Sequence, residues 1–373
     1  MIVAITNTPR PYAWGSSTAI AQLLGTVPSG GPEAELWLGS HPVSPATVVA
    51  TGEPLAARLP FLLKILAADN PLSLQAHPTA SQAQQGFARE NEQGVPLDAP
   101  HRNYKDPFPK PEIIYALSDK FEALCGFRPV EETRELLLTL GLDDVAARLD
   151  ALPSLFEWMI TRGEGVDELI ARVVALTKTQ DYTPCASPDG TKAVGLAGDS
   201  CVLEVLATAR MLAEEYPGDP GIIISLLLNR VTLNRGEALY LPAGNIHAYL
   251  RGLGVELMTA SDNVLRGGLT PKHIDVPELL RVLDFTTSPV PYLRPEGDVY
   301  HPADADFALI RVETDASWSL TGPAVAICVE GHFRVAGANS STAMQRGDAV
   351  YVTADEGALT VSGVGELFLA TTV

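Results

Sequence analysis

The segment Arg235-Gly-Glu-Ala-Leu-Tyr-Leu-Pro-Ala-Gly-Asn-Ile-His247 carries the most specific signal in the chain. Gly236 suits a turn that opens an apolar strand, because glycine adopts positive φ without strain. Pro242 and Gly244 favour a second turn directly after that strand. If the strand belongs to a closed β-barrel, His247 can point into the barrel interior. A lone histidine after a strand is usually structural, but this full spacing favours a functional one.

Composition excludes several classes of protein. The chain has 373 residues and a formal net charge of −19. That charge argues against nucleic-acid binding, which needs a basic face, and disfavours docking to an anionic membrane. There is no apolar run of membrane-spanning length and no leader-like N-terminus, so we expect a cytoplasmic protein. Four scattered cysteines form no CxxC pair, and we expect them to be buried thiols: Cys125, Cys185, Cys201 and Cys328.

The length exceeds the size at which one hydrophobic core usually keeps growing, so two or three units are expected. Up to Asp119 the chain shows short β-like runs separated by turn residues. Helical periodicity replaces them between Pro129 and about Tyr216. After the breaker Pro217-Gly-Asp-Pro-Gly221, strand-like sequence resumes with Ile222-Ile-Ile-Ser-Leu-Leu-Leu228. A short helix at residues 277–283 then leads into a last block of alternating strands.

Further residues complete a candidate metal site with His247. Gln75 and His77 are two apart, so on a strand both side chains face the same side. Glu112 opens an apolar strand, where an unpaired carboxylate is costly to bury. Singly, Gln75 is an ordinary strand residue and Glu112 is more often solvated at a strand edge. Together the four form a nitrogen and oxygen set suited to one zinc ion with an open position. The other five histidines are expected to be surface or structural: His41, His101, His273, His301 and His332.

The spacing from Gly236 to His247 matches the second metal-binding motif of the cupin superfamily, with Arg251 where asparagine is usual. Over essentially its whole length the chain resembles type I mannose-6-phosphate isomerase. The matching segments include Tyr12-Ala-Trp-Gly-Ser16, Glu35-Leu-Trp-Leu-Gly-Ser-His-Pro42, Phe61-Leu-Leu-Lys-Ile-Leu66, Leu72-Ser-Leu-Gln-Ala-His-Pro78, Lys110-Pro-Glu112, Phe121-Glu-Ala-Leu-Cys-Gly-Phe-Arg128, Leu241-Pro-Ala-Gly-Asn-Ile-His-Ala-Tyr249 and the stretch from Glu256 to Lys272. The resemblance implies that Gln75, His77, Glu112 and His247 bind zinc and that Arg266 is the catalytic arginine.

One position departs from the family pattern. The family commonly has Asn-His-Lys-Pro-Glu where this chain has Phe108-Pro-Lys-Pro-Glu112. Pro109 therefore replaces a histidine beside Lys110. The metal ligands are intact, but a proton carried by that histidine in relatives must be carried by another group here.

The activity that the resemblance implies is interconversion of mannose 6-phosphate and fructose 6-phosphate through an enediol. This reaction needs a base, stabilisation of an oxyanion and an anchor for phosphate. Arg266 suits the enediolate or the phosphate, although a structural ion pair with Asp262 or Glu256 is the alternative. Lys110 faces the pocket if it shares a strand with Glu112. The remaining assignments are Asp262 and Glu256 as bases or supporting partners, Lys272 and Ser73 at the phosphate, and Tyr249 and Trp14 at the substrate.

Two other function classes fit the same scaffold. A cupin dioxygenase would use iron, and a non-catalytic sugar-sensing or metal-binding protein would retain the fold without turnover. An oxidative cupin has little use for a phosphate site, whereas Arg266, Lys272 and Lys110 give this site local positive charge. The chain also lacks GxxxxGK[ST], which argues against nucleotide phosphoryl transfer.

We therefore expect a mainly β protein with two cupin-type jelly-roll domains and an inserted α-helical domain. The catalytic jelly roll comprises residues 1–120 and 218–283, the helical domain 121–217, and the second jelly roll 284–373. In that second domain, Arg346-Gly347 resembles Arg235-Gly236, but Thr353, Asp355 and Ala358 stand where Pro242, Gly244 and His247 do, so we expect it to be metal-free. The expected partner is a small sugar phosphate, and the expected state is a monomer.

Overall fold

The computed structural model describes residues 1–178 and 199–373, and it is mainly β, as the sequence predicts. In this part of the chain the strands form two antiparallel sheets. The larger sheet contains β2 (Glu35–Leu38), β4 (Phe61–Ala68), β5 (Leu74–Ala76), β6 (Glu112–Ala116), β7 (Lys120–Phe127), β8 (Leu228–Asn234), β9 (Ala238–Leu241), β10 (His247–Thr259), β11 (Leu265–Gly268) and β12 (Tyr292–Leu293). The smaller contains β1 (Ile2–Thr6), β3 (Thr47–Val48), β13 (Val299–Tyr300), β14 (Phe307–Val312), β15 (Ala316–Ser319), β16 (Ala324–Ala336), β17 (Ser341–Gln345), β18 (Ala349–Val352) and β19 (Ala358–Thr372).

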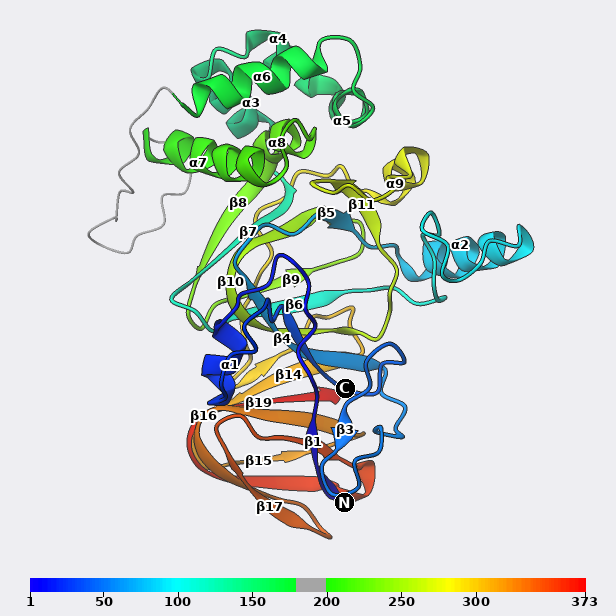
Figure 1. The fold of residues 1–373 in the computed structure, drawn as a ribbon, viewed down its shortest axis with the longest axis vertical. Coiled ribbons are helices and arrows are strands. Elements are labelled where there is room, and N and C mark those ends of the chain that lie inside the picture. Colours follow the sequence, from blue (N-terminus) through cyan, green and yellow to red (C-terminus); the bar gives the residue numbers. More distant parts are fainter. Residues whose placement is uncertain (179–198) are drawn as a thin grey trace.

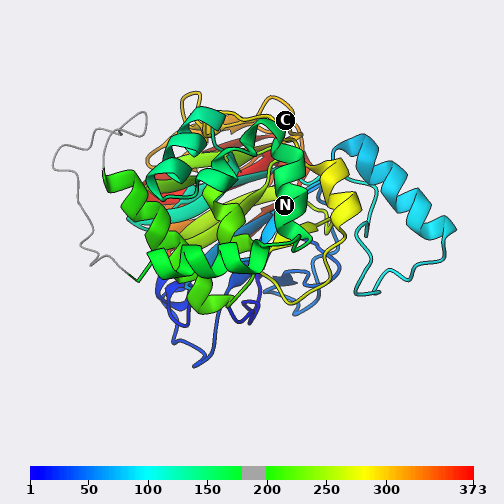
Figure 2. The ribbon, with the colours of Figure 1, turned by 90° about the horizontal axis from the view of Figure 1, so that it is seen from above.

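Helices gather at the end of the molecule opposite the smaller sheet (Figure 1), and the view from above shows them lying over the larger sheet (Figure 2). That group contains α3 (Val130–Thr139), α4 (Asp143–Ala146), α5 (Leu152–Ile160), α6 (Val166–Leu176), α7 (Asp199–Glu215) and α8 (Gly221–Ile224). Helix α9 (Val276–Val282) packs at the edge of this group, and its Leu279 and Val282 belong to the same apolar cluster, whereas α1 (Ala19–Leu24) and α2 (Ala80–Glu92) lie elsewhere. None of the helices in the described ranges has the length and apolar character needed to cross a membrane.

Side chains of the larger sheet lie in three environments: an apolar layer shared with the smaller sheet, an apolar layer beneath the helices, and a polar inner surface. On β4 and β10, Leu63, Ile65 and Val255 join an apolar layer shared with the smaller sheet. On β5, Leu74 and Ala76 pack beneath the helices, in one cluster with residues of α5 and α6. Alternate residues of the same strands turn the other way, because neighbouring side chains of a strand leave opposite faces. The polar residues of the site lie on this inner surface.

Several expectations about local structure need correction. The run Ile222–Leu228, expected as a strand, forms α8 and a 3-10 turn before β8 begins at Leu228. Its side chains are buried on all sides, and such an apolar run has no period that separates strand from helix. The helix α2 lies within the stretch read as β, and its N-terminus carries a Thr79–Gln82 capping box.

The boundaries of the units also differ from expectation. Residues 120–127 form strand β7 of the larger sheet, so the helical segment begins at Val130 rather than at residue 121. Strand β1, expected in the first unit, pairs with β18 of the smaller sheet. Strand β12 lies beyond residue 284 but pairs with β9 of the larger sheet. Each sheet therefore takes a strand from beyond the boundary that the sequence predicts. Of the four cysteines, Cys125 and Cys328 are buried and unpaired, as expected, whereas Cys185 and the Cys201 side chain lie outside the described residues.

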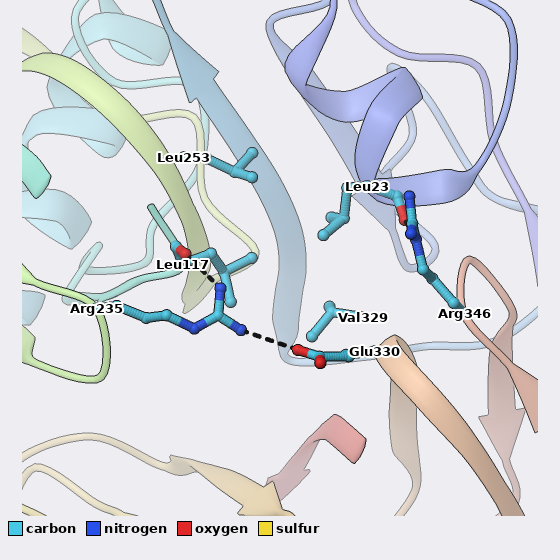
Figure 3. Close-up of a pocket in the computed structure, with 7 residues that line it drawn as sticks. All are labelled: Leu23, Leu117, Arg235, Leu253, Val329, Glu330 and Arg346. Atoms are coloured by element: carbon cyan, nitrogen blue, oxygen red, sulfur yellow. Dashed lines mark hydrogen bonds and ion pairs between the residues drawn. The ribbon is translucent and has the colours of Figure 1, made fainter. Parts of the chain in front are cut away.

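The two sheets also meet through charged side chains. Figure 3 shows Arg235 and Arg346 on opposite sides of a cavity of about 240 Å³ with an aliphatic lining. Each arginine precedes a glycine with φ of +93°, Gly236 and Gly347, as the motif resemblance predicts. Buried Glu366 of β19 accepts hydrogen bonds from Arg235 at 2.6 Å, Arg311 at 2.8 Å and the Tyr115 hydroxyl at 3.1 Å.

Glu366→Ala should therefore weaken the junction of the sheets. The fully buried Tyr115 hydroxyl loses its acceptor, while Arg235 and Arg311 keep their exposed partners Glu330 and Glu313. We therefore expect the free energy of unfolding to fall by about 2 kcal/mol, measured by urea denaturation. Glu330→Ala is the matched control, because Glu330 also pairs with Arg235 but is 68% exposed, and it should cost less than about 0.5 kcal/mol. Equal stability of the Glu366→Ala protein and the wild type would contradict this description of the junction.

Candidate metal centre and active site

Three predicted ligands converge from three strands of the larger sheet. Glu112 is the first residue of β6, His247 is the first residue of β10, and His77 directly follows β5. One ligand atom from each residue lies within 4.8 Å of the others, and all three side chains are buried. The Glu112 carboxylate lies 3.2 Å from His77 Nε2 and 3.4 Å from His247 Nε2. Within the described part of the chain, this is the one such group of histidine, cysteine and acidic side chains.

Backbone carbonyls fix the tautomers of both histidines. His77 Nδ1 lies 2.8 Å from the Asn263 carbonyl, and His247 Nδ1 lies 3.0 Å from the Asn245 carbonyl. A carbonyl oxygen only accepts hydrogen bonds, so each Nδ1 carries the proton. Each Nε2 then presents a lone pair toward Glu112, and neither has a hydrogen-bond partner. Two lone pairs and a carboxylate directed at the same point require a cation between them, and this orientation is typical of histidines that bind metal.

The charges around Glu112 keep it ionised. Burial acts to raise its pKa, but the ammonium group of Lys110 holds that pKa well below the ordinary range. Lys110 Nζ lies 2.9 Å from Glu112 Oε1, and the Tyr249 hydroxyl donates to Oε2 at 3.4 Å. Burial, together with Lys110, lowers the pKa of His77 to about 4, so its ring stays neutral and able to bind a metal at neutral pH. This set of donors, two imidazoles and a carboxylate, fits zinc.

Strand register places Gln75 beside this group. Gln75 on β5 pairs with His247 on one side and with Arg266 of β11 on the other. Residues directly opposite each other in antiparallel strands project from the same face, so all three side chains share the inner surface. Burial lowers the pKa of Arg266, and burial together with Arg266 lowers that of Lys272, which places Lys272 in the field of Arg266. Within the described residues no ion pair joins Arg266 to Asp262 or Glu256.

Glu256 has a different cationic partner. Its carboxylate lies 2.8 Å from Lys64 Nζ, and both side chains are less than 8% exposed. Lys64 also lies 3.5 Å from Glu35, which accepts a hydrogen bond from the Trp37 indole at 2.8 Å. Burial raises the pKa of Glu256, although Lys64 opposes that rise. The inner surface therefore carries buried ion pairs, from Glu256 through Lys64 to Glu35, which extend from the region of the metal ligands to β2.

Asp262 lies in a tightly held loop after β10. The Asp106 carboxylate accepts hydrogen bonds from the Asp262 backbone at 2.9 Å and from the Ser261 hydroxyl at 2.8 Å. Asn263 donates to the Phe108 carbonyl at 2.8 Å, and its own carbonyl faces His77. The loop thus joins the segment around Pro109 to a metal ligand.

The remaining predicted residues lie at the edges of this region. Ser73 is half-buried and precedes β5, where Leu74 pairs with Gly268 of β11. Trp14 is half-buried, stacks on Tyr12 with ring centroids 5.7 Å apart, and packs against the apolar cluster that contains Tyr249. The Tyr249 side chain itself is 1% exposed.

Comparison with known proteins agrees with this geometry. The family model for the catalytic domain of type I phosphomannose isomerase matches residues 50–130. The chain is 37% identical to the mannose-6-phosphate isomerases of Shigella flexneri and of Escherichia coli (strain K12), over 97% of this chain and 97% of each relative. The chain belongs to the mannose-6-phosphate isomerase family. A crystal structure of a zinc-bound mannose 6-phosphate isomerase superposes with a TM-score of 0.86 at 33% identity, covering 100% of this chain and 99% of that one.

For this mannose-6-phosphate isomerase family member, sequence reasoning overlooked part of the polar interior. Lys64 interrupts an otherwise apolar strand. An unpaired charge in such a strand is costly, so the position of Lys64 indicates a buried acidic partner. His41 was expected at the surface or in a structural role, but it is 6% exposed and lies 3.4 Å from Asp262. Asn263 and Asp106 act through backbone contacts, for which spacing in the sequence gives no signal.

Removing one ligand should abolish stoichiometric zinc binding. We expect about one zinc per wild-type chain by inductively coupled plasma mass spectrometry, and at least about 100-fold weaker binding for His247→Ala, since even losing a supporting partner of a ligand costs 10- to 100-fold. His332→Ala is the control, because His332 is exposed on β16 of the smaller sheet and should leave zinc content unchanged. Full zinc content in the His247→Ala protein would contradict the assignment.

Proposed function

We propose that the protein is a zinc-dependent aldose–ketose isomerase that interconverts mannose 6-phosphate and fructose 6-phosphate through an enediol. The observation that carries the proposal is the buried set of His77, Glu112 and His247, whose two Nε2 lone pairs face one carboxylate. Membership of the mannose-6-phosphate isomerase family supplies the substrate class. The reaction transfers a proton from C2 of the open-chain aldose to C1 of the ketose.

The proposed zinc site takes Gln75 as its fourth protein ligand. Register supports this choice, because Gln75 lies directly opposite His247. A bound zinc ion supplies Lewis-acid polarisation of the sugar oxygens. Lys110 and Tyr249 support the site by holding the Glu112 carboxylate from both oxygens. We therefore propose that Tyr249 acts on Glu112 rather than contacting the sugar directly.

Proton transfer falls to the carboxylates of the inner surface. Glu256, whose pKa burial raises, is suited to accept and return a proton, with Lys64 beside it as a cationic partner. Asp262 is the second candidate, at the exposed end of the loop that follows β10. Lys110 places positive charge beside the ligand carboxylate, where an oxyanion of the enediolate would gain stability.

The phosphate is proposed to bind on the side of Gln75 away from His247. Arg266 neighbours Gln75 in register, and Lys272 lies in its field, so two cations meet at this edge. Guanidinium groups bind phosphate through paired hydrogen bonds. Ser73 adds a hydroxyl near the end of β11, and Trp14 is the proposed apolar wall at the opposite edge.

The domain organisation is also a proposal. The larger sheet supports a catalytic jelly roll and the smaller sheet a second, metal-free jelly roll, with helices α3–α8 inserted between β7 and β8. Ala358 begins β19 as His247 begins β10, which supports a duplication that lost its ligands. The pairing of β1 and β3 moves residues 2–6 and 47–48 into the second unit. A cytoplasmic location and a monomeric state stay predictions of the sequence.

A coupled assay with zinc removal and restoration tests the function. The wild-type protein should convert mannose 6-phosphate to fructose 6-phosphate, lose activity after treatment with a chelator and regain it with zinc. Mannose lacking phosphate should be a far poorer substrate, because it leaves Arg266 and Lys272 without their anion. No turnover in either the stripped or the restored form would overturn the proposal.

Arg266→Ala should lower kcat/KM by about 10²- to 10³-fold, since one charged donor to a developing oxyanion or phosphate supplies a barrier reduction of that size. Arg266→Lys should retain part of the activity because it keeps the charge and loses the paired geometry. Arg251→Ala is the control: Arg251 lies on β10 and is exposed, so its loss should leave kcat/KM within about twofold of wild type. Near-normal turnover in the Arg266→Ala protein would remove Arg266 from the machinery.

A further inference from the structure

His41 lies behind Asp262 as seen from solvent. Its side chain is 5% exposed, whereas that of Asp262 is 38% exposed, and its Nε2 lies 3.4 Å from Asp262 Oδ2. The ring packs edge-on against Trp37, with centroids 4.9 Å apart. Trp37 in turn lies against Lys64, whose Nζ is 5.1 Å from the Trp37 ring centroid. His41 is therefore continuous with the polar interior and not a surface residue.

The backbone fixes which nitrogen of His41 carries the proton. The Val43 N–H donates to His41 Nδ1 at 3.3 Å. A nitrogen that accepts a hydrogen bond has no proton of its own, so the ring is the neutral Nε2–H tautomer. That N–H is directed at Asp262. The arrangement resembles a base held by a second group, with the carboxylate on the accessible side.

Asp262 is equally well fixed from its other side. Its backbone N–H donates to Asp106, and the next residue, Asn263, places its carbonyl on metal ligand His77. Asp262 is thus one residue from a group that orients the metal site. Burial acts to raise the Asp262 pKa, but the hydrogen bond from His41 and the charges of Lys110 and Lys64 hold it below the ordinary range.

Residues 106–109 lie next to the His41–Asp262 pair and bear on its role in proton transfer. The Phe108 carbonyl accepts from Asn263, so residues 106–109 pack on the same loop. Pro109 stands in this segment, and proline has no side-chain proton to exchange. Asp106 accepts from the Ser261 hydroxyl and the Asp262 backbone, and Lys110 pairs with Glu112, which leaves Asp262, whose side chain is 38% exposed and paired with His41, as the candidate of this loop for proton transfer.

We propose that His41 is a positioning residue, which holds Asp262 as an oriented carboxylate for proton exchange with the sugar phosphate. The proposal rests on the proposed isomerase function. Of the two candidate bases, Asp262 takes a proton from the substrate in the forward direction and returns it to the product, while Glu256 stays ion-paired with Lys64 and His41 keeps its Nε2 proton throughout. No net proton is consumed.

Kinetics of three variants of the zinc-loaded enzyme test this role. His41→Leu removes the donor and should lower kcat about 10- to 100-fold with KM within about threefold of wild type. His41→Gln places an amide N–H at the same reach, and it should recover kcat to within about fivefold of wild type. His332→Leu, at an exposed position of the smaller sheet, controls for loss of a histidine and should leave kcat unchanged.

The pH profile separates positioning from simple destabilisation. Without the Nε2–H bond the Asp262 carboxylate is harder to keep ionised, so the acidic limb of kcat should move to higher pH in the His41→Leu protein. In an Asp262→Asn background, His41→Leu should cause almost no further loss, because the two residues act as one unit. An unshifted limb, or losses that multiply in the double variant, would overturn the proposal.

Two further outcomes keep the tests separate. If the wild-type protein turns over and the His41→Leu protein has the same kinetics, the role of His41 is refuted and the isomerase function stands. Absence of wild-type turnover would refute both. If His41→Leu does not fold, nitrogen-15 NMR of the wild type decides: a ring with Nδ1–H, or a fully protonated ring, at neutral pH contradicts the proposal, and the Nε2–H tautomer supports it.

Discussion

The ionised Glu112 carboxylate is the constraint on which the rest of the site depends. Burial opposes its charge, and an uncompensated carboxylate in such a place costs several kcal/mol. Lys110 and Tyr249 satisfy part of that charge, and the two histidine lone pairs add to the negative field instead of relieving it. Only a cation completes the arrangement. The residues that orient the histidines, Asn245 and Asn263, therefore serve the metal even though neither touches it.

The fold meets this constraint by using alternate residues of the same strands for different purposes. On β10, Val255 faces the smaller sheet and Glu256 faces the polar interior. On β5, Leu74 packs beneath the helices while Gln75 lies opposite His247. Helices on one side and a second sheet on the other thus cover the outer faces of these walls with apolar packing. Such support on rigid strands is what precise placement of ligands requires.

The convergence of His77, Glu112 and His247 was predictable because each lies in a local sequence pattern, while Gln75 stays a prediction as the fourth ligand. The spacing to His247, the two-residue separation of Gln75 and His77, and a carboxylate that opens an apolar strand all follow from strand geometry. The roles of Lys64, His41 and Asn263 were not predicted. A lysine in an apolar strand indicates a buried partner, but the partner of each residue is set only when distant strands and loops come together. Local periodicity also misread Ile222–Leu228, where burial on all sides removes the pattern, and could not foresee that β1 joins a distant sheet.

The central claim is that one metal ion lies between His77, Glu112 and His247. A crystal of the zinc-loaded protein, with anomalous data collected on both sides of the zinc absorption edge, tests it most directly. We expect one anomalous peak per chain, bonded to Nε2 of both histidines and to the Glu112 carboxylate at roughly 2.0–2.2 Å. A fully zinc-loaded protein with its peak elsewhere, or with Nδ1 toward the metal, would contradict the account.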